Sequence, residues 1–357
     1  MEITSLLKEI TAKGASDIFI VAGRPLTYKL NGKMHTISEM PVMPQDTLEL
    51  VSAIYYLADQ RDMSHLLATG DDDFSFAVKG ISRFRASTYK QRGSLSAVIR
   101  IITFSLPSPY ELHIPDSVMD LANARKGLVL VTGPAGGGKS TTLACMIDKI
   151  NREQEKHIIT LEDPLEYLHR HRKSIVSQRE ICTDTDSYLT ALRAALRQSP
   201  DVILLGEMRD HETMNVAMTA AETGHLIFST LHTIGAANTI ERVVDAFPPN
   251  QQHQITIQLS TVLQAVVSQQ LLPAENGTVI PAFEVMILTP AIRTMIREGN
   301  MHQIDSAIFS SSQKNMISMD SSIYNLYQKG LISSKTAIAY ATNPDSMAQK
   351  TDHAFSS

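Results

Sequence analysis

The sequence predicts an α/β protein with two domains: a small α+β domain, then a larger domain with a central, mainly parallel sheet and a helical C-terminal tail. Up to residue 102, short strand-like segments are joined by tight turns, whereas from about residue 114 apolar strands alternate with helices. Between these patterns lies Leu106-Pro107-Ser108-Pro109, and proline interrupts both helices and interior strands. We therefore expect a first domain over 1–102, a linker over 103–113 and a second domain over 114–357.

The first domain is expected to begin with an amphipathic helix, because apolar residues recur at helical spacing within residues 1–13. Asn31-Gly32 is a strong hairpin signal, since both residues tolerate the positive φ angles of a two-residue turn. A helix opened by Pro44 is expected over about 45–67. The expected strands of this domain are 17–21, 26–30, 34–37, 74–78, 82–91 and 95–102.

The second domain is expected to alternate strands with helices. Its predicted strands are 128–132, 157–161, 174–177, 202–205 and 226–230, and its predicted helices are 139–151, 186–198, 212–223 and 235–245. After Pro248-Pro249 the pattern indicates a long helix over 251–271 and a strand near 279–287. Short helices that stop at Gly299 and Gly330 complete the tail, and the last ten residues or so are expected to be disordered.

The composition is that of an ordinary globular protein, with 43% hydrophobic and 19% charged residues among 357. A net charge of −5 argues against a surface that coats nucleic acid, so no nucleic-acid partner is expected. The two cysteines, Cys145 and Cys182, indicate neither a disulfide framework nor a zinc site, which favours a reducing, intracellular setting. No apolar run approaches the ~18 residues of a spanning helix, so any membrane association is expected to be peripheral.

A glycine-rich motif, G-x-x-x-x-G-K-S-T, lies between the strand predicted at 128–132 and the helix predicted from Lys139. Its glycines let backbone N–H groups point inward at phosphate oxygens, and the helix N-terminus adds partial positive charge. Lys139 supplies a charge for the β- and γ-phosphates, and Ser140 a hydroxyl ligand for Mg²⁺. We therefore expect ATP with Mg²⁺ to bind at Gly133, Pro134, Ala135, Gly136, Gly137, Gly138, Lys139, Ser140 and Thr141.

Polar residues follow three other strands of the predicted sheet. Glu162-Asp163 follows one strand, Glu207 follows the next, and His232 follows a third. The carboxyl ends of parallel strands meet at one edge, so these side chains are expected beside the phosphate-binding loop. There a carboxylate holds Mg²⁺, directly or through water, and orients the attacking water. The alternatives are that Glu162-Asp163 only caps a turn and that His232 is a structural histidine.

Four arginines lie on neighbouring strands of the first domain: Arg83, Arg85, Arg92 and Arg100. Such charges most often form a solvated face. An arginine delivered to a γ-phosphate from another domain or subunit, however, accelerates nucleotide hydrolysis. Both interpretations stay open for these four arginines.

The chain resembles the secretion ATPases of type II secretion and type IV pili. The segments GPAGGGKSTT, ITLEDPLEYLH, SPDVILLGEMRD and AAETGHLIFSTLHT are similar to the Walker A, Asp box, Walker B and His box of that family, in order and spacing. The stretch PAIRTMIREG at 290–299 is similar to one associated with pilus retraction. The chain departs from the family at Phe19, where histidine is usual, and at Gly137, where serine is usual.

The resemblance implies a PAS-like first domain, a RecA-like P-loop second domain, and a cytoplasmic homohexamer that hydrolyses ATP to power pilus retraction. It implies peripheral association with the inner membrane through a platform protein of the pilus machine. In this family Glu207 would act on Mg²⁺ and water, Glu162 and Asp163 would support them, and His232 would lie near the nucleotide. Arginines of the first domain, Arg85, Arg92 and Arg100 among them, would reach the nucleotide across a domain interface.

Three alternatives stay open at this stage. An extension or type II secretion ATPase of the same superfamily typically carries a further N-terminal domain and a tetracysteine element, and no C-x-x-C occurs here. The acidic balance and the retraction-like stretch disfavour a DNA-transfer ATPase. A scaffold that binds nucleotide without hydrolysis would be expected to lack one catalytic acid, whereas Lys139, Ser140, Glu162 and Glu207 are all present. Which retraction paralogue the chain represents is also left open.

Overall fold

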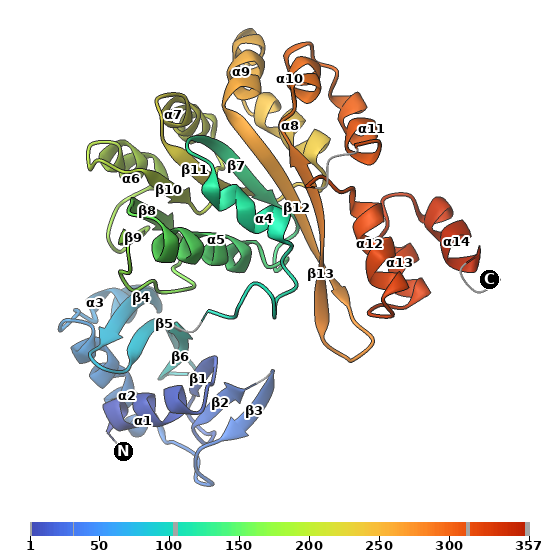
Figure 1. Cartoon of the computed structure of the whole chain (residues 1–357). Helices are drawn as coiled ribbons and strands as arrows, with labels where there is room; N and C mark the ends of the chain where they lie inside the picture. The colour runs from blue at the N-terminus through green and yellow to red at the C-terminus, as the bar shows by residue number, and fades with distance from the viewer. Residues whose placement is uncertain (1, 31, 103–105, 312–314, 354–357) are drawn as a thin grey trace. The chain divides into compact units, whose positions relative to one another are not determined.

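The computed structural model describes residues 2–30, 32–102, 106–311 and 315–353. The chain divides into two compact units (Figure 1). The first comprises residues 1–105 together with 166–168, and the second comprises 106–165 and 169–357. Among the described residues, no helix combines the length and the apolar character that crossing a membrane requires.

The first unit contains a six-stranded antiparallel sheet in the order β3-β2-β1-β6-β5-β4. Its strands are β1 (Asp17–Ile20), β2 (Thr27–Leu30), β3 (Lys33–Thr36), β4 (Asp71–Val78), β5 (Ser82–Gln91) and β6 (Ser94–Ile102). Helix α1 (Ile3–Ala12) buries Ile3, Leu6, Leu7 and Ile10, as its periodicity predicts. Apolar residues from one face of the sheet and from the helices form a single core.

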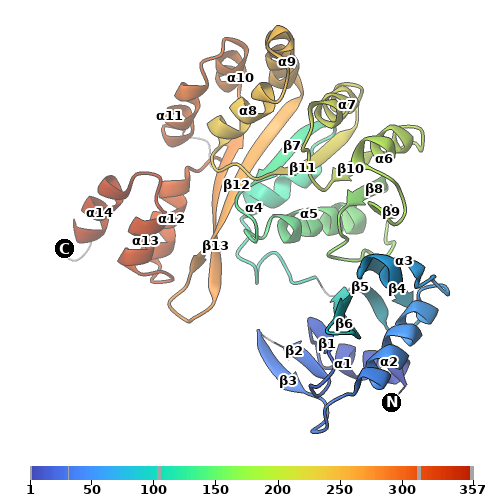
Figure 2. The same ribbon diagram turned by 180° about the vertical axis from the view of Figure 1, so that it is seen from behind.

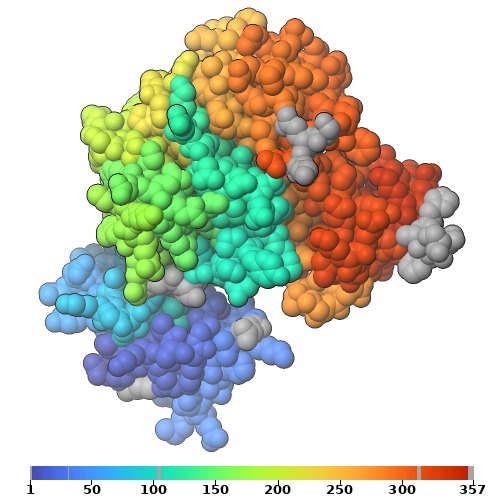
Figure 3. Space-filling view, viewed as in Figure 1, coloured from blue at the N-terminus to red at the C-terminus, as the bar shows by residue number. Residues whose placement is uncertain are grey.

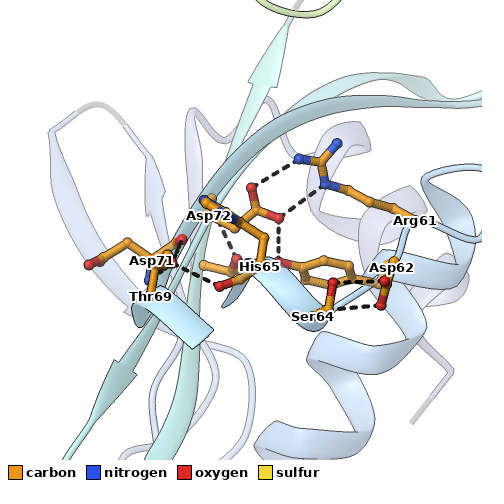
Figure 4. A network of polar contacts seen from close by, with 9 residues as sticks. Arg61, Asp62, Ser64, His65, Thr69, Asp71 and Asp72 are labelled. Carbon is orange, nitrogen blue, oxygen red and sulfur yellow. Dashed lines mark hydrogen bonds and ion pairs between the residues drawn. The ribbon is translucent and has the colours of Figure 1, made fainter. Parts of the chain in front are cut away.

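The helix expected over 45–67 is wrong as one element, because it is broken into α2 (Pro44–Leu57) and α3 (Ser64–Thr69). Asp59 and Gln60 have φ angles of 53° and 58°, which no right-handed helix accommodates. The break places Arg61 beside β4. There the Arg61 guanidinium donates hydrogen bonds of 3.0 Å to both carboxylate oxygens of Asp72 (Figure 4).

Asp72 is the centre of a buried polar network in this unit (Figure 4). Its side chain is only 4% exposed, and the Tyr55 hydroxyl donates to it at 2.8 Å. Thr88 joins through the Tyr55 hydroxyl at 2.9 Å and donates to the Asp72 carbonyl oxygen at 3.0 Å. Burial opposes ionisation of Asp72, but the bonds from Arg61 and Tyr55 outweigh it, so the Asp72 pKa lies below its usual value.

The second unit is built on a seven-stranded sheet in the order β13-β12-β7-β11-β10-β8-β9. All neighbouring pairs are parallel except β12 with β13, which confirms the predicted mainly parallel α/β sheet. The strands are β7 (Gly127–Thr132), β8 (His157–Glu162), β9 (Ile175–Glu180), β10 (Val202–Leu205), β11 (Leu226–Leu231), β12 (Leu263–Pro273) and β13 (Val279–Ile287).

Helices cover both faces of this sheet (Figures 1 and 2). Residues of α6 (Tyr188–Ala195), α7 (His211–Glu222), α8 (Ala236–Asp245) and α9 (Pro249–Val262) pack with Leu128 and Leu130 of β7. Residues of α4 (Asp116–Met119) and α5 (Lys139–Glu153) pack with Val129 and Val131 on the other face. Successive side chains of β7 therefore pack alternately into the two cores, which is why every residue of the strand is buried.

The helix expected over 251–271 is correct only as far as Val262. From Leu263 the chain is strand β12, which pairs with β7 on one side and β13 on the other. Val266 and Val267 are fully buried on opposite faces, one in each core. β-branched residues that pack on both faces suit a central strand better than a helix.

The C-terminal tail is helical, as predicted. Its helices are α10 (Pro290–Arg297), α11 (Ile304–Phe309), α12 (Met319–Gln328), α13 (Ser334–Tyr340) and α14 (Pro344–His353). The expectation that the last ten residues are disordered is wrong for 348–353, because these belong to α14, where Met347 and Thr351 are each 1% exposed. Residues 354–357 lie outside the described part. The space-filling view shows these helices against the rest of the second unit (Figure 3).

Candidate active site

The glycine-rich loop connects Thr132, at the end of β7, to Lys139, at the start of α5. Gly136 and Gly138 have φ angles of 73° and 81°, in the left-handed region that suits glycine. Gly138 is the N-cap of α5, so the loop turns directly into the helix N-terminus. Ser140 and Thr141 stand in the first turn of α5, where a helix N-terminus attracts anions.

Close contact with β12 explains two more of the glycine requirements. A Cβ at Gly133 would lie 2.1 Å from the backbone oxygen of Gln269, and one at Gly138 would lie 2.7 Å from the Gln269 amide nitrogen. At Gly137 a Cβ would come within 2.9 Å of the Pro134 carbonyl oxygen. At Gly133, Gly137 and Gly138 there is therefore space for backbone only, and this cradle fits phosphate groups bound through N–H donors.

Lys139 is 8% exposed and its ammonium group lies across the loop. It donates to the carbonyl oxygens of Gly133 at 2.9 Å and Pro134 at 2.8 Å. These two contacts hold the ammonium group where phosphate oxygens would enter. Ala135 and Gly136 form the exposed tip of the loop.

The strand register brings the predicted acids and histidine to the same edge of the sheet. Thr132 pairs with Leu231, so the loop and His232 start side by side. Leu205 pairs with Leu161 in β8, and the Gly206 amide donates to the Leu161 carbonyl oxygen at 2.8 Å. Glu162 and Glu207 consequently leave neighbouring strands together.

Both carboxylate oxygens of Glu207 contact a basic side chain. The Arg209 guanidinium pairs with Oε1 at 2.5 Å, and His232 Nε2 lies 3.4 Å from Oε2. The Glu207 side chain is 14% exposed, whereas those of Arg209 and His232 are 75% and 62% exposed. These three residues line a hollow of about 420 Å³. A charged, fixed carboxylate at the edge of a hollow is suited to hold a metal-bound or attacking water.

Tyr188 connects the acids of two strands. Burial, and then the negative charges of Glu207, Asp163 and Glu162, raise the Tyr188 pKa above its usual value, which places all three acids within electrostatic reach of its hydroxyl. A Cβ at Gly206 would lie 2.8 Å from the Tyr188 hydroxyl oxygen, so glycine there makes space for the phenol. The negative charges of the three predicted acids therefore all act on one phenol, which stays neutral.

Asp163 and Pro164 form a bend directly after β8 and are joined by a cis peptide bond. A bend at this point is compatible with either role assigned to Glu162-Asp163. His225, in contrast, is accounted for structurally, because its Nδ1 lies 2.9 Å from the Ala220 carbonyl oxygen. In the part of the chain that the structure describes, no group of three or more histidine, cysteine and acidic side chains forms a metal cluster.

Three of the four candidate arginines lie together, and the fourth does not. Arg85 and Arg100 are direct cross-strand partners, and Arg83 is two residues from Arg85, so these three share one face of the sheet. Arg100 pairs with Asp17 at 3.1 Å. Arg92 instead lies in the turn between β5 and β6, with a φ angle of 49°.

A second, smaller hollow of about 180 Å³ adjoins the first turn of α5. Its lining includes His113 and Ile114 from the segment before α4, Thr141 from α5, and Leu271 from β12. A lining that mixes apolar and polar residues in this way suits the base and sugar of a nucleotide better than its phosphates.

Sequence reasoning missed Arg209, Tyr188 and Gln269. Arg209 stands two residues after Glu207, and this short spacing could have predicted that it pairs with the carboxylate. Gln269 was hidden by the incorrect helix over 251–271, although Val266-Val267 in the same segment indicated a strand. Tyr188 carried no signal, because only the packing of α6 brings it to Gly206.

Comparison with known proteins agrees with this geometry. A profile of the type II/IV secretion system protein family matches residues 1–277. The type IV pilus retraction ATPase PilT of Pseudomonas aeruginosa is 44% identical over 308 residues, covering 86% of this chain and 89% of that protein. The type IV pilus ATPase PilU of the same organism is 40% identical over 315 residues, covering 88% and 82%.

Solved structures give the same result. The crystal structure of the pilus retraction motor PilT with bound ADP matches with a TM-score of 0.88 at 45% identity, over 97% of this chain and 98% of that one. The ATPase DotB of Legionella pneumophila matches with a TM-score of 0.76 at 26% identity, over 95% of each chain. The resemblance and the fold class expected from the motifs are thus confirmed, and the chain belongs to the type II/IV secretion system protein family.

Proposed function

We propose that this chain is a motor ATPase that hydrolyses ATP to power retraction of type IV pili. The observation that carries the proposal is the meeting, at one sheet edge, of a phosphate-binding loop containing Lys139 and a fixed carboxylate, Glu207. The relative named as the pilus retraction ATPase PilT supports the biological role, and the PilT structure with bound ADP supports nucleotide binding.

Each residue at this edge has a distinct part in the proposed reaction. The loop amides and Lys139 bind and orient the β- and γ-phosphates. Ser140 and, through water, Glu207 would hold Mg²⁺, which would supply positive charge to neutralise the phosphates. Glu207 orients the attacking water and accepts its proton, while Glu162 and Asp163 support the metal and water. His232, against Glu207, faces the transferring phosphate.

The quaternary setting is part of the same proposal. A homohexamer in the cytoplasm, docked peripherally at the inner membrane on a platform protein of the pilus machine, would turn hydrolysis into movement of the pilus. At least one arginine of the first unit would reach a nucleotide across a domain interface and stabilise charge at the γ-phosphate. Support for this setting comes from the retraction relatives and from Arg83, Arg85 and Arg100 sharing a face.

A type II secretion ATPase is a weaker candidate. The type II secretion system protein E of Aeromonas hydrophila is 34% identical, and this chain covers only 53% of it. The relatives PilT and PilU are instead covered to 89% and 82%. A retraction role is therefore favoured over secretion.

The test is deletion of the gene from its own piliated host, with imaging of fluorescently labelled pili. We expect cells that keep surface pili but no longer shorten them, with rescue by the parent chain and none by Lys139→Ala. Loss of surface pili would indicate an extension motor instead. Normal shortening in the deletion strain would overturn the retraction role.

A further inference from the structure

Gln269 of β12 touches both ends of the phosphate-binding loop. Its backbone oxygen occupies the space that a Cβ at Gly133 would need, at 2.1 Å. Its side-chain amide nitrogen occupies the space that a Cβ at Gly138 would need, at 2.7 Å. One residue therefore lies against the first and the last glycine of the loop.

The side chain of Gln269 is held in place from α5. The Thr142 hydroxyl donates to Gln269 Oε1 at 2.7 Å, and the two residues are 1% and 3% exposed. Because Oε1 accepts from Thr142, the NH₂ end of the amide is turned toward Gly138. A buried polar side chain with this orientation is specified by hydrogen bonding and not by apolar packing.

We propose that Gln269 is a positioning residue, which with Thr142 holds the phosphate-binding loop in the shape that binds nucleotide. The loop consists largely of glycine and has many accessible backbone conformations, so a fixed neighbour lowers the entropy lost when phosphate is bound. Lys139 crosses the same loop from Gly133 to Pro134, and its reach depends on the loop keeping its curvature.

The experiment measures the Kd for ADP by calorimetry and the KM for Mg²⁺-ATP, using full-length Gln269→Met and Thr142→Val. Each variant keeps side-chain volume and removes the buried hydrogen bond. We expect each to weaken ADP binding and to raise KM by about tenfold, with a smaller change in kcat. The double variant should be no worse than the more affected single variant, because both changes remove the same bond.

Two further variants test the oxygen end and the nitrogen end of the Gln269 amide separately. Gln269→Glu keeps an acceptor for Thr142 but places a carboxylate beside Gly138, so it should weaken ADP binding more than Gln269→Met does. Thr142→Ser keeps the hydroxyl and should bind ADP within about twofold of the parent. The matched control is Gln270→Ala, because Gln270 is the next residue along β12 and projects from the opposite face.

A purely structural role for Gln269 and Thr142 is distinguished by which constants change: the apparent kcat alone, or KM and Kd. Partial unfolding lowers the active fraction and therefore the apparent kcat, but it leaves KM and Kd unchanged. Values of Kd and KM within twofold of the parent in both folded variants, Gln269→Met and Thr142→Val, would overturn the inference. The inference rests on the proposed nucleotide site, yet Kd tests it separately: a parent that binds ADP without hydrolysing ATP contradicts only the motor function.

Discussion

At the scale of single residues, Glu207 combines charge with fixed geometry. Arg209 and His232 each hold one of its oxygens, while the side chain itself is 14% exposed. A carboxylate held in this way loses little freedom when it takes up a water or a metal ligand, because its orientation is already set. This is the arrangement expected of a group that orients the attacking water.

We predict that Glu207→Gln keeps ADP affinity and lowers kcat for ATP by about 10²-fold or more, because the amide neither accepts a proton nor carries charge. Steady-state ATPase assays and calorimetry measure the two quantities. Lys139→Ala, in contrast, should lose nucleotide binding. The control is Glu212→Gln, the same change at an exposed position in the first turn of α7. Turnover by Glu207→Gln at the parent rate would remove Glu207 from the mechanism and would leave a role for the other acids only.

Asp72 shows how burial and hydrogen bonding compete in the first unit. Its pKa is lowered, so in the folded state it binds fewer protons than the unfolded chain near its ordinary pKa of 3.8. Its contribution to stability is therefore present above about pH 4 and is lost as the pH falls through its lowered folded-state pKa.

We predict that Asp72→Asn lowers the stability of the first unit at pH 7 by about 1–3 kcal/mol, since Arg61 loses a charged acceptor inside a buried network. The difference from the parent should shrink as the pH is lowered below about 4, because Asp72 itself becomes protonated. Calorimetric unfolding at a series of pH values measures this. A difference that stayed constant down to pH 2.5 would show that the Asp72 charge has no part in the stability.

At the scale of elements, α10 has an apolar face and a charged face. Ile292 and Ile296 are buried, at 1% and 0% exposure, whereas Arg293 and Arg297 are exposed. The apolar face packs with the α8–α9 side of the sheet. Packing alone explains the buried face, and the charged face is available for contact with another protein.

We predict that Arg293→Ala combined with Arg297→Ala preserves folding, assembly and ATPase activity, because no residue at the nucleotide site changes. Cells carrying the double variant should nevertheless fail to shorten their pili, if the charged face couples turnover to the pilus platform. Imaging of labelled pili together with an ATPase assay on the purified chain measures both effects. The control is Lys329→Ala with Lys335→Ala, which removes the same charge from exposed positions elsewhere in the tail. Normal retraction by the α10 variant would assign this helix to ordinary packing.

At the scale of the whole molecule, the chain consists of two units with separate cores. The nucleotide-binding loop and the acids belong to the second unit, and the arginines belong to the first. A contribution of the arginines to catalysis therefore requires a contact between units, within one chain or between copies.

We predict that alanine at one or more of Arg83, Arg85, Arg92 and Arg100 lowers kcat by about 10³-fold without altering ADP affinity, the effect of losing an arginine at the γ-phosphate. A fragment beginning near Leu112 should likewise keep the phosphate-binding loop and hydrolyse ATP poorly. Asp17→Asn is the control for Arg100, because it removes that arginine's ion pair and leaves the guanidinium. Four variants with turnover within threefold of the parent would identify the arginines as a solvated face.

The sequence by itself determined the parallel sheet, the phosphate-binding loop and the acids that follow its strands. These features depend on local patterns: apolar runs, glycine spacing, and polar residues placed directly after a strand. Parallel pairing then carries Glu162, Glu207 and His232 to one edge, because strands that run in the same direction end on the same side.

Only the tertiary structure decided which residues surround that edge. Leu263–Pro273 became β12 because it fills the place between β7 and β13, and neighbouring strands override a weak helical pattern. Gln269 reaches the loop, and Tyr188 reaches Gly206, only through this packing. Contacts between residues more than a hundred positions apart, such as Thr142 with Gln269, follow from how complete elements pack, and no local pattern encodes them.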